Sequence, residues 1–464
     1  MMRTGKYTAK DRSWVRRNGD NMKLNYKRTF LVGLAFMSIC AFWQTYDNII
    51  PLILQNTFGL GETVTGALMA ADNVLALFLL PVFGAFSDKV DTRFGKRMPF
   101  IVVGTVLAVI FYLLLPMADG KANLVLFLVA LFGALVSMGL YRSPAVALMP
   151  DVTPAPLRSK ANAVINLMGA VGGVYALIMI KLLVGKGETP DYMPLFVSVA
   201  ALMVVCVGVL VITINERKVK ALVAEEEKVF GGREAGDKAS ANASSAETEA
   251  DAFVDTTAKT MPADVKRSML FLLASVFLWF TAYNAVTTAF SRYTKVVWKL
   301  EGGGFANCLM VATVAAILSY LPIGMISSKI GRKKTILGGI VLMTFCYLAA
   351  FFCPTYQSWI NIAFAVIGVG WAAISVNSYP MVVEMSKEGD IGKYTGTYYT
   401  FSMAAQIFTP IFSGFLLEYV SYKTLFPYAF VFMIIAFLIM TQVRHGDSKP
   451  MKKESILENF DVED

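Results

Sequence analysis

The loop after the second long apolar stretch reads Gly84-Ala-Phe-Ser-Asp88-Lys89, followed by Arg93-Phe-Gly95-Lys96-Arg97. A second version, Gly324-Met-Ile-Ser-Ser328-Lys329-Ile-Gly331-Arg332-Lys333-Lys334, follows the eighth stretch, about 240 residues later. Each copy lies at the foot of the second helix in a set of six, which predicts that the chain consists of two related halves. Two six-helix halves that face each other in a bilayer are typical of transporters.

The composition indicates a membrane protein. Hydrophobic residues make up 56% and charged residues 16% of the 464 positions, against about 25% charged in soluble domains. Runs of about 20 apolar residues are long enough to cross about 30 Å of hydrocarbon, and without strand alternation they must be helices. Twelve such runs occur, at 29–55, 62–86, 99–118, 122–149, 160–184, 193–214, 268–291, 304–327, 335–353, 357–384, 394–417 and 424–442. The expected fold is an all-α membrane protein with twelve transmembrane helices in two pseudo-symmetric six-helix bundles.

The net charge of +9 sets the orientation in the membrane. With the N-terminus inside, 34 of the 42 Lys and Arg residues fall in cytoplasmic segments and only five fall in outer loops. This asymmetry predicts that both termini are cytoplasmic in a protein of the plasma or inner membrane. The basic residues therefore serve orientation and contact with lipid, and we expect no nucleic-acid partner.

Polar segments divide the chain into five parts. We expect a basic arm at 1–28, a six-helix bundle at 29–214, a cytoplasmic loop at 215–266, a second bundle at 267–442 and a cytoplasmic tail at 443–464. The central loop is rich in Ala, Ser, Glu and Thr, which cannot bury enough apolar surface to offset the entropy of ordering. We predict that it is disordered and tethers the two halves.

Several function classes are excluded. The five cysteines, which lie in or at the ends of apolar runs without a Cys-x-x-Cys pair, indicate packing residues and neither disulfides nor a metal site. No Gly-x-x-x-x-Gly-Lys-(Ser/Thr) loop is present, so the chain is not an ATP-driven pump. We expect no enzyme activity, no cofactor and no metal.

The repeated loop resembles the signature loop of the major facilitator superfamily, with the pattern Gly-x-x-x-Asp-(Arg/Lys) followed by Gly-(Arg/Lys)-(Arg/Lys). The resemblance implies a conformational latch at the inner face of the membrane. Asp88 is expected to meet either the loop bases or the N-terminus of a neighbouring helix, the eleventh, whereas Ser328 replaces the acid in the second copy. The implied latch residues are Gly84, Asp88, Lys89, Arg93, Gly95, Lys96, Arg97, Gly324, Lys329, Gly331 and Arg332.

Further stretches resemble the sucrose-transporter-like branch and, more loosely, the glycoside–pentoside–hexuronide symporters. These stretches are Ser143-Pro144 to Asp151, Arg158 to Asn166, Gly370-Trp371, Tyr379-Pro380 and Gly392 to Gly396. The resemblance implies transport of a sugar, such as sucrose or another glucoside. Two departures matter: the helix-4 arginine of plant sucrose symporters aligns with Val146, one turn after Arg142, and the sodium-site aspartates of glycoside symporters fall near the apolar Leu75 and Leu79. The second departure favours protons over sodium.

Three ionisable residues lie at membrane depth, where charge is costly and indicates function. They are Asp47 in the first helix, Asp72 in the second and Arg142 in the fourth. We predict that one aspartate couples transport to protons, since proton uptake would release the arginine and permit closure of the loaded transporter. Asp47 and Asp72 are near-equal candidates, and the alternative is a permanent Asp–Arg brace.

A sugar needs amide and hydroxyl groups for its hydroxyls and aromatic faces for its C–H side. The sequence offers such residues at helical spacing, and the candidates are Gln44, Asn48, Arg142, Asn162, Asn166, Tyr283, Asn284, Trp371, Asn377 and Gln406. For any one of them, a hydrogen bond between helices is an equally good interpretation.

The sequence thus predicts a monomeric secondary transporter that moves a sugar with protons by alternating access. Three alternatives stay open: a sodium-coupled glycoside symporter, a proton-linked exporter of drugs or metabolites, and a membrane receptor that transports nothing.

Overall fold

The structure is a computed structural model that describes residues 24–154, 157–187, 189–226, 262–385 and 391–447. Most of the predicted N-terminal arm, central loop and tail lies outside these ranges.

Twelve helices among the described residues are long and apolar enough to cross a membrane, which confirms the predicted fold class. The first half contains α2 (Tyr26–Asn56), α3 (Glu62–Lys89), α4 (Met98–Gly120), α5 (Leu124–Asp151), α6 (Arg158–Leu183) and α7 (Met193–Thr213). The second half contains α9 (Ala263–Val296), α10 (Ala306–Ile330), α11 (Arg332–Phe351), α12 (Ile360–Met385), α13 (Ile391–Tyr419), the short helix η2 (Tyr422–Thr424) and α14 (Leu425–Thr441).

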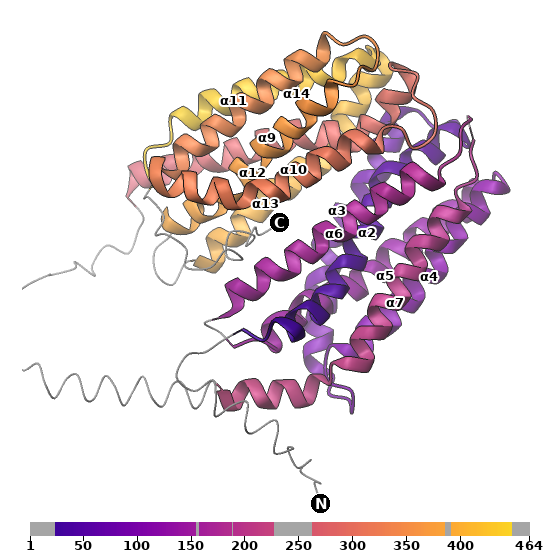
Figure 1. Ribbon diagram of the computed structural model, residues 1–464, viewed down its shortest axis with the longest axis vertical. Helices are drawn as coiled ribbons and strands as arrows, with labels where there is room; N and C mark the ends of the chain where they lie inside the picture. Colours follow the sequence, from indigo (N-terminus) through magenta and orange to yellow (C-terminus); the bar gives the residue numbers. More distant parts are fainter. Residues whose placement is uncertain (1–23, 155–156, 188, 227–261, 386–390, 448–464) are drawn as a thin grey trace, which may run out of the picture.

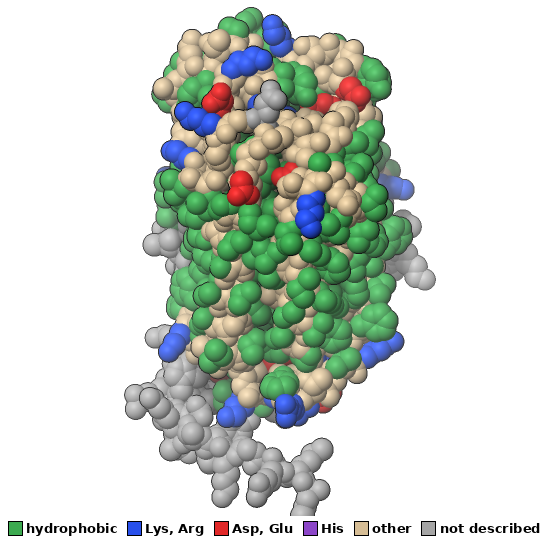
Figure 2. All heavy atoms as spheres, turned by 90° about the vertical axis from the view of Figure 1, so that its right-hand side faces the viewer, with side chains coloured by type: hydrophobic (Ala, Val, Ile, Leu, Met, Phe, Trp, Pro, Cys, Tyr) green, Lys and Arg blue, Asp and Glu red, His purple; other side chains and the backbone are tan. Residues whose placement is uncertain are grey.

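The helices begin and end where the local sequence favours it. The side chains of Asn25 and Asn123 cap α2 and α5 by accepting hydrogen bonds from backbone N–H groups of the first turn. Proline occupies the first turn of α4 and of α7, where its missing N–H costs nothing. Hydrophobic side chains form a band around the middle of the molecule, and charged side chains gather towards its two ends (Figure 2). The chain is therefore an integral, multi-pass membrane protein.

The two halves repeat the same packing. In the first half α2 packs on α6 and α7, α5 packs on α3 and α4, and α4 packs on α7. In the second half the corresponding pairs are α9 with α13 and α14, α12 with α10 and α11, and α11 with α14. The internal repeat that was read from two loops therefore extends to whole six-helix bundles.

The halves meet through α3 with α13, α6 with α10, and α2 with α9. We call the end that carries the Gly84–Arg97 loop the inner end and the opposite end the outer end. At the outer end the backbones are very close: a Cβ atom at Gly66 of α3 would lie 2.0 Å from the carbonyl oxygen of Pro410 in α13. The two bundles approach each other at this end and diverge towards the inner end (Figure 1).

Candidate functional site

A cavity of about 300 Å³ lies between the halves, and its wall comes from both of them. Helices α2 and α6 supply the first-half wall, and α9, α10 and α12 supply the second-half wall. A pocket of this size, largely apolar with a few polar groups, is typical of small-molecule sites. Its lining residues are Phe36, Cys40, Trp43, Gln44, Asp47, Asn166, Leu167, Gly169, Ala170, Gly173, Tyr283, Ala312, Thr313, Ala316, Ile317, Tyr320, Ile367, Gly368 and Trp371. We call it the central cavity.

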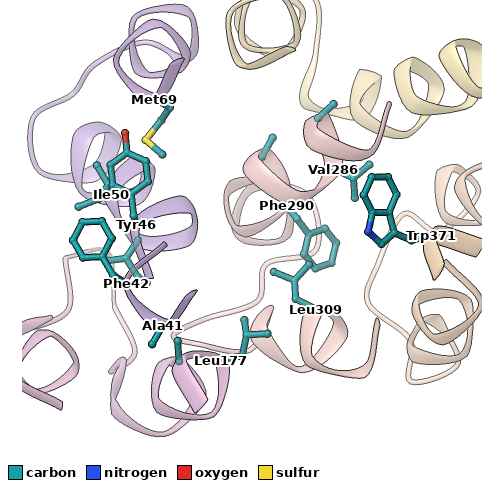
Figure 3. Packing of buried hydrophobic residues seen from close by; sticks show 14 of the residues in the cluster. Ala41, Phe42, Tyr46, Ile50, Met69, Leu177, Val286, Phe290, Leu309 and Trp371 are labelled. Atoms are coloured by element: carbon teal, nitrogen blue, oxygen red, sulfur yellow. The ribbon is translucent and has the colours of Figure 1, made fainter. Parts of the chain in front are cut away.

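Aromatic rings dominate the second-half wall. The rings of Tyr283 and Trp371 stack with centroids 3.8 Å apart and planes 8° apart, and Phe280 meets Trp371 edge-on at 5.2 Å. The stack forms because α9 and α12 pack together, and Figure 3 shows Trp371 beside Val286 of α9. Trp43 lines the cavity from the other half. These flat faces can take the C–H side of a sugar ring or a flat apolar group.

The polar wall comes mainly from one stripe of α2. Phe36, Cys40, Trp43, Gln44 and Asp47 are spaced by three or four residues, so they lie on the same face of the helix. This face turns towards α6 because the two helices are in close contact. A Cβ atom at Gly172 of α6 would lie 1.9 Å from the carbonyl oxygen of Met37. Asn166 completes the polar wall from α6.

The structure brings together five of the predicted substrate and coupling residues. Gln44, Asp47, Asn166, Tyr283 and Trp371 all line the central cavity. Two of them come from one helix and the others from three further helices. Their shared lining groups them into one site.

Other predicted substrate residues do not line the central cavity. Asn48 is 1% exposed and donates a 2.8 Å hydrogen bond from Nδ2 to the carbonyl oxygen of Gln44. Asn377 is equally buried and bonds in the same way to the carbonyl oxygen of Ala373 at 2.9 Å. Each amide thus donates to a carbonyl group one turn earlier in its own helix, and neither residue lines the central cavity. Asn162, Asn284 and Gln406 also lie outside the lining.

Asp72 and Arg142 line a separate, narrow cavity of about 10 Å³ between α3 and α5. The two residues carry groups of opposite charge and line the same narrow cavity. The backbone N–H and the side-chain Nδ2 of Asn73 donate to Oδ1 of Asp72 at 2.6 and 2.7 Å. Trp43 lines both cavities.

Sequence reasoning missed several lining residues. Trp43, Phe36 and Cys40 lie on the stripe that already carried Gln44 and Asp47, so extending that stripe towards the inner end would have found them. Thr313 and Tyr320 come from α10, which had no amide-rich pattern to draw attention to it.

The first loop holds three helices of the first half at the inner end. Arg97 donates to Oδ1 of Asp88 at 2.5 Å and to Oδ2 of Asp151 at 3.0 Å, and it also bonds to Ser87. Asp88 thus meets a loop base, which was one of its two expected partners. Glu216 accepts from the backbone N–H groups of Lys96, Arg97 and Met98 at 2.8–3.1 Å and so caps α4.

The remaining residues of this loop lie around that cluster. Lys89 ends α3, and Gly84 faces Ser143 of α5, whose Oγ would be 3.1 Å from a Cβ atom at Gly84. Arg93 lies over the ring of Phe94 at 4.7 Å. Gly95 has a φ of +115°, which only glycine adopts easily.

The second loop is built differently because Ser328 cannot pair with a base. The hydroxyl of Ser328 donates to the carbonyl oxygen of Met325 in its own helix. The carboxylate comes from the tail instead: Oδ1 of Asp447 accepts from the backbone N–H of Lys333 at 2.7 Å. Arg332 pairs with Glu384 of α12, and Gly331 has a φ of +97°. Gly324 and Lys329 lie within α10.

Comparison with known proteins points to one family. The family model of the Major Facilitator Superfamily matches residues 32–313 and 302–459. The chain is 27% identical over 100 residues to the "Chloramphenicol resistance protein CraA" of Acinetobacter baumannii, across 22% of this chain and 24% of that protein. It is 24% identical over 151 residues to the "Sucrose transport protein SUC3" of Arabidopsis thaliana, across 28% of this chain and 25% of that protein. The matches thus span about a quarter of each relative.

Solved structures share the fold at low sequence identity. A bacterial homologue of the human drug peptide transporters superposes with a TM-score of 0.64 at 14% identity, over 90% of this chain and 98% of that one. The nucleoside transporter NupG gives the same TM-score and identity, over 90% and 100%. A bacterial homologue of the iron transporter ferroportin, solved in an inward-facing state, gives 0.62 at 12%, over 91% and 99%.

Proposed function

We propose that this chain, which belongs to the Major Facilitator Superfamily and is therefore a membrane transporter, carries a sugar together with protons by alternating access. The observation that carries the proposal is the central cavity, where a stacked aromatic pair from one half faces a carboxylate and two amides from the other. A site whose walls belong to two halves changes shape when the halves rock, which is what alternating access requires.

The lining chemistry supports a neutral, hydroxyl-rich substrate. The Tyr283–Trp371 stack offers a flat apolar face for the C–H side of a sugar ring. Gln44 and Asn166 supply amide groups, and Asp47 can accept hydrogen bonds from sugar hydroxyls. The partial likeness to a sucrose transport protein and the motifs at Ser143–Asp151 and Gly370-Trp371 favour a disaccharide such as sucrose or another glucoside.

Asp47 is the proposed coupling residue. It lines the cavity that the substrate would enter, so proton binding and substrate binding occur in the same compartment. Asp72 and Arg142 act as a brace between α3 and α5, since they share a narrow cavity within one half. Neutral Asp47 would let the loaded site close without burying a charge, because an uncompensated buried charge is costly.

We propose the plasma or inner membrane as the location, with the inner end in the cytoplasm. The loops at this end carry most of the Lys and Arg residues, as the positive-inside rule requires of cytoplasmic loops. The site is complete within one chain, so a monomer suffices.

A proton-linked exporter of apolar cations is the second candidate. The positive charge of Arg142 would disfavour a cationic substrate, but Arg142 does not line the central cavity. The Asp47 carboxylate and the aromatic rings of this cavity together suit an organic cation, because aromatic faces attract positive charge. The partial likeness to a chloramphenicol resistance protein favours an exporter as well.

Transport assays in proteoliposomes separate the candidates. Radiolabelled sucrose, maltose and a lipophilic cation are each offered under a proton gradient, under a sodium gradient and without a gradient. A sugar symporter accumulates sugar under the inward proton gradient. Movement of the cation alone supports the exporter, accumulation driven only by sodium supports a sodium symporter, and no movement of any substrate contradicts the sugar proposal.

A further inference from the structure

A buried ion pair joins the two halves at the outer end. Glu62 is the first residue of α3, and Arg292 lies one turn before the end of α9. Nε of Arg292 donates to Oε2 of Glu62 at 2.8 Å, and the two side chains are only 5% and 3% exposed. The hydroxyl of Tyr422 in η2 donates to the other carboxylate oxygen, Oε1. We call these three residues the outer cluster.

The ion pair adds little to the free energy of folding beyond what an apolar contact of similar size would add. Desolvating two charges costs about as much as their attraction returns, so a buried ion pair is weak evidence for stability. Breaking it by removing one partner is costly, however, because the other charge stays buried. An interaction with these properties is suited to a contact that is either fully made or fully broken.

The surroundings of the outer cluster also join the halves. The backbone N–H of Thr63 donates to Oε2 of Glu418 in α13 at 2.7 Å. Nζ of Lys181 in α6 donates to Oδ1 of Asn307 in α10 at 3.1 Å. Every one of these contacts crosses from the first half to the second, and all of them lie at the outer end.

Water can reach the outer cluster once it loosens. A cavity of about 710 Å³ lies on its outer side and is lined by residues of both halves, including Glu62, Glu418, Tyr422 and Lys423. When the halves separate here, both charges of the pair gain water instead of remaining buried. The pair is therefore stable in the closed arrangement and can be hydrated in the open one.

We propose that Glu62, Arg292 and Tyr422 form the lock of the outer gate, which holds the outer end closed while the central cavity communicates with the inner end. Opening outwards separates α3 from α9 and η2, so it must break both contacts of Glu62. The inference rests on transport by alternating access but not on the identity of the substrate. A variant that removes one partner should shift the resting population towards the outward-open state.

Cys40 provides a readout because it lines the central cavity. The other four cysteines are replaced by Ala, and a membrane-impermeant maleimide is added from one side of right-side-out or inside-out vesicles. Glu62→Gln leaves Arg292 buried without a counter-charge, so the rate of Cys40 labelling from the outer side should rise by at least about tenfold. Tyr422→Phe removes one hydrogen bond and should raise the rate in the same direction by less, about threefold.

The matched control is Glu301→Gln, the same change at an exposed glutamate of the outer loop between α9 and α10. It should leave both labelling rates unchanged. Labelling from the inner side should fall in Glu62→Gln as it rises from the outer side, which a general loosening of the fold would not produce. Unchanged outer-side rates in both Glu62→Gln and Tyr422→Phe would overturn the proposal. The assay needs no substrate, so it gives an answer even if the sugar proposal fails.

Discussion

Asp47 and Asp72 have the same side chain at comparable membrane depth, yet they lie in different surroundings. Asp47 lines a cavity of about 300 Å³ that both halves share, together with two amides and a stacked aromatic pair. Asp72 lines a cavity of about 10 Å³ inside one half, with Arg142 as its oppositely charged neighbour. One acid therefore lines a cavity shared by both halves, and the other lines a narrow cavity within one half.

Membrane depth and charge do not by themselves define a coupling residue. Both acids follow the rule that ionisable residues within a membrane face the interior of the protein and mark functional sites. What separates them is the cavity that each lines: the α2 stripe lines the cavity shared by both halves, whereas Asp72 of α3 shares a narrow cavity with residues of α5. We therefore propose that Asp47 couples transport to protons and that Asp72 braces α3 against α5.

The largest expected effect on stability comes from Arg142→Gln. Asp72 and Arg142 are only partly buried and line the same narrow cavity, so loss of one charge should cost about 1 kcal/mol and lower the unfolding temperature in detergent. The double variant with Asp72→Asn should regain most of this loss, because neither charge is then left alone. If Arg142→Gln is as stable as the wild type, or the double variant is no better than the single one, Asp72 and Arg142 are not a brace.

Trp371→Ala tests the cavity that contains Asp47. Loss of the stacked face should raise KM for the sugar about fivefold, since aromatic contacts contribute about 1 kcal/mol beyond their buried area. The accumulation ratio under a proton gradient should stay the same, because the coupling acid is intact. Trp359→Ala is the matched control, as this tryptophan is 41% exposed and lies outside the lining. An unchanged KM in Trp371→Ala would show that the Tyr283–Trp371 stack does not contribute to sugar binding.

The smallest expected effect is that of Asp72→Asn on the coupling of transport to protons. This variant should retain the wild-type accumulation ratio at a given proton gradient, although less protein folds. The ratio is measured on protein that elutes as a single species and is therefore independent of the folded yield. Loss of accumulation with normal exchange would transfer the coupling role from Asp47 to Asp72.

Much of the fold could be predicted because it depends on periodic, local signals. Apolar runs of spanning length give the twelve helices, and a loop that occurs twice gives the two halves. Polar and aromatic residues at helical spacing pointed to five candidates that all line the central cavity: Gln44, Asp47, Asn166, Tyr283 and Trp371. These residues could be found because a polar side chain on an apolar helix is conspicuous.

The remaining features depend on contacts between distant segments. Asn48 and Asn377 carry the same chemistry as Gln44, but their amides donate to backbone carbonyl groups one turn earlier in their own helices. The carboxylate of the second loop comes from Asp447, more than a hundred residues beyond the loop. Glu62 stands at a helix start, and only the packing of α3 against the second half reveals Arg292 as its partner. Helix phase and inter-half contacts were not encoded in any local pattern.

We propose that Asp47 couples protons to a sugar in a cavity shared by the two halves. The most direct measurement is uptake of radiolabelled sucrose and maltose into proteoliposomes, with and without an inward proton gradient, for the wild type and Asp47→Asn. The account predicts gradient-driven accumulation in the wild type, and in the variant exchange of sugar without accumulation. Accumulation by Asp47→Asn equal to that of the wild type would contradict the claim.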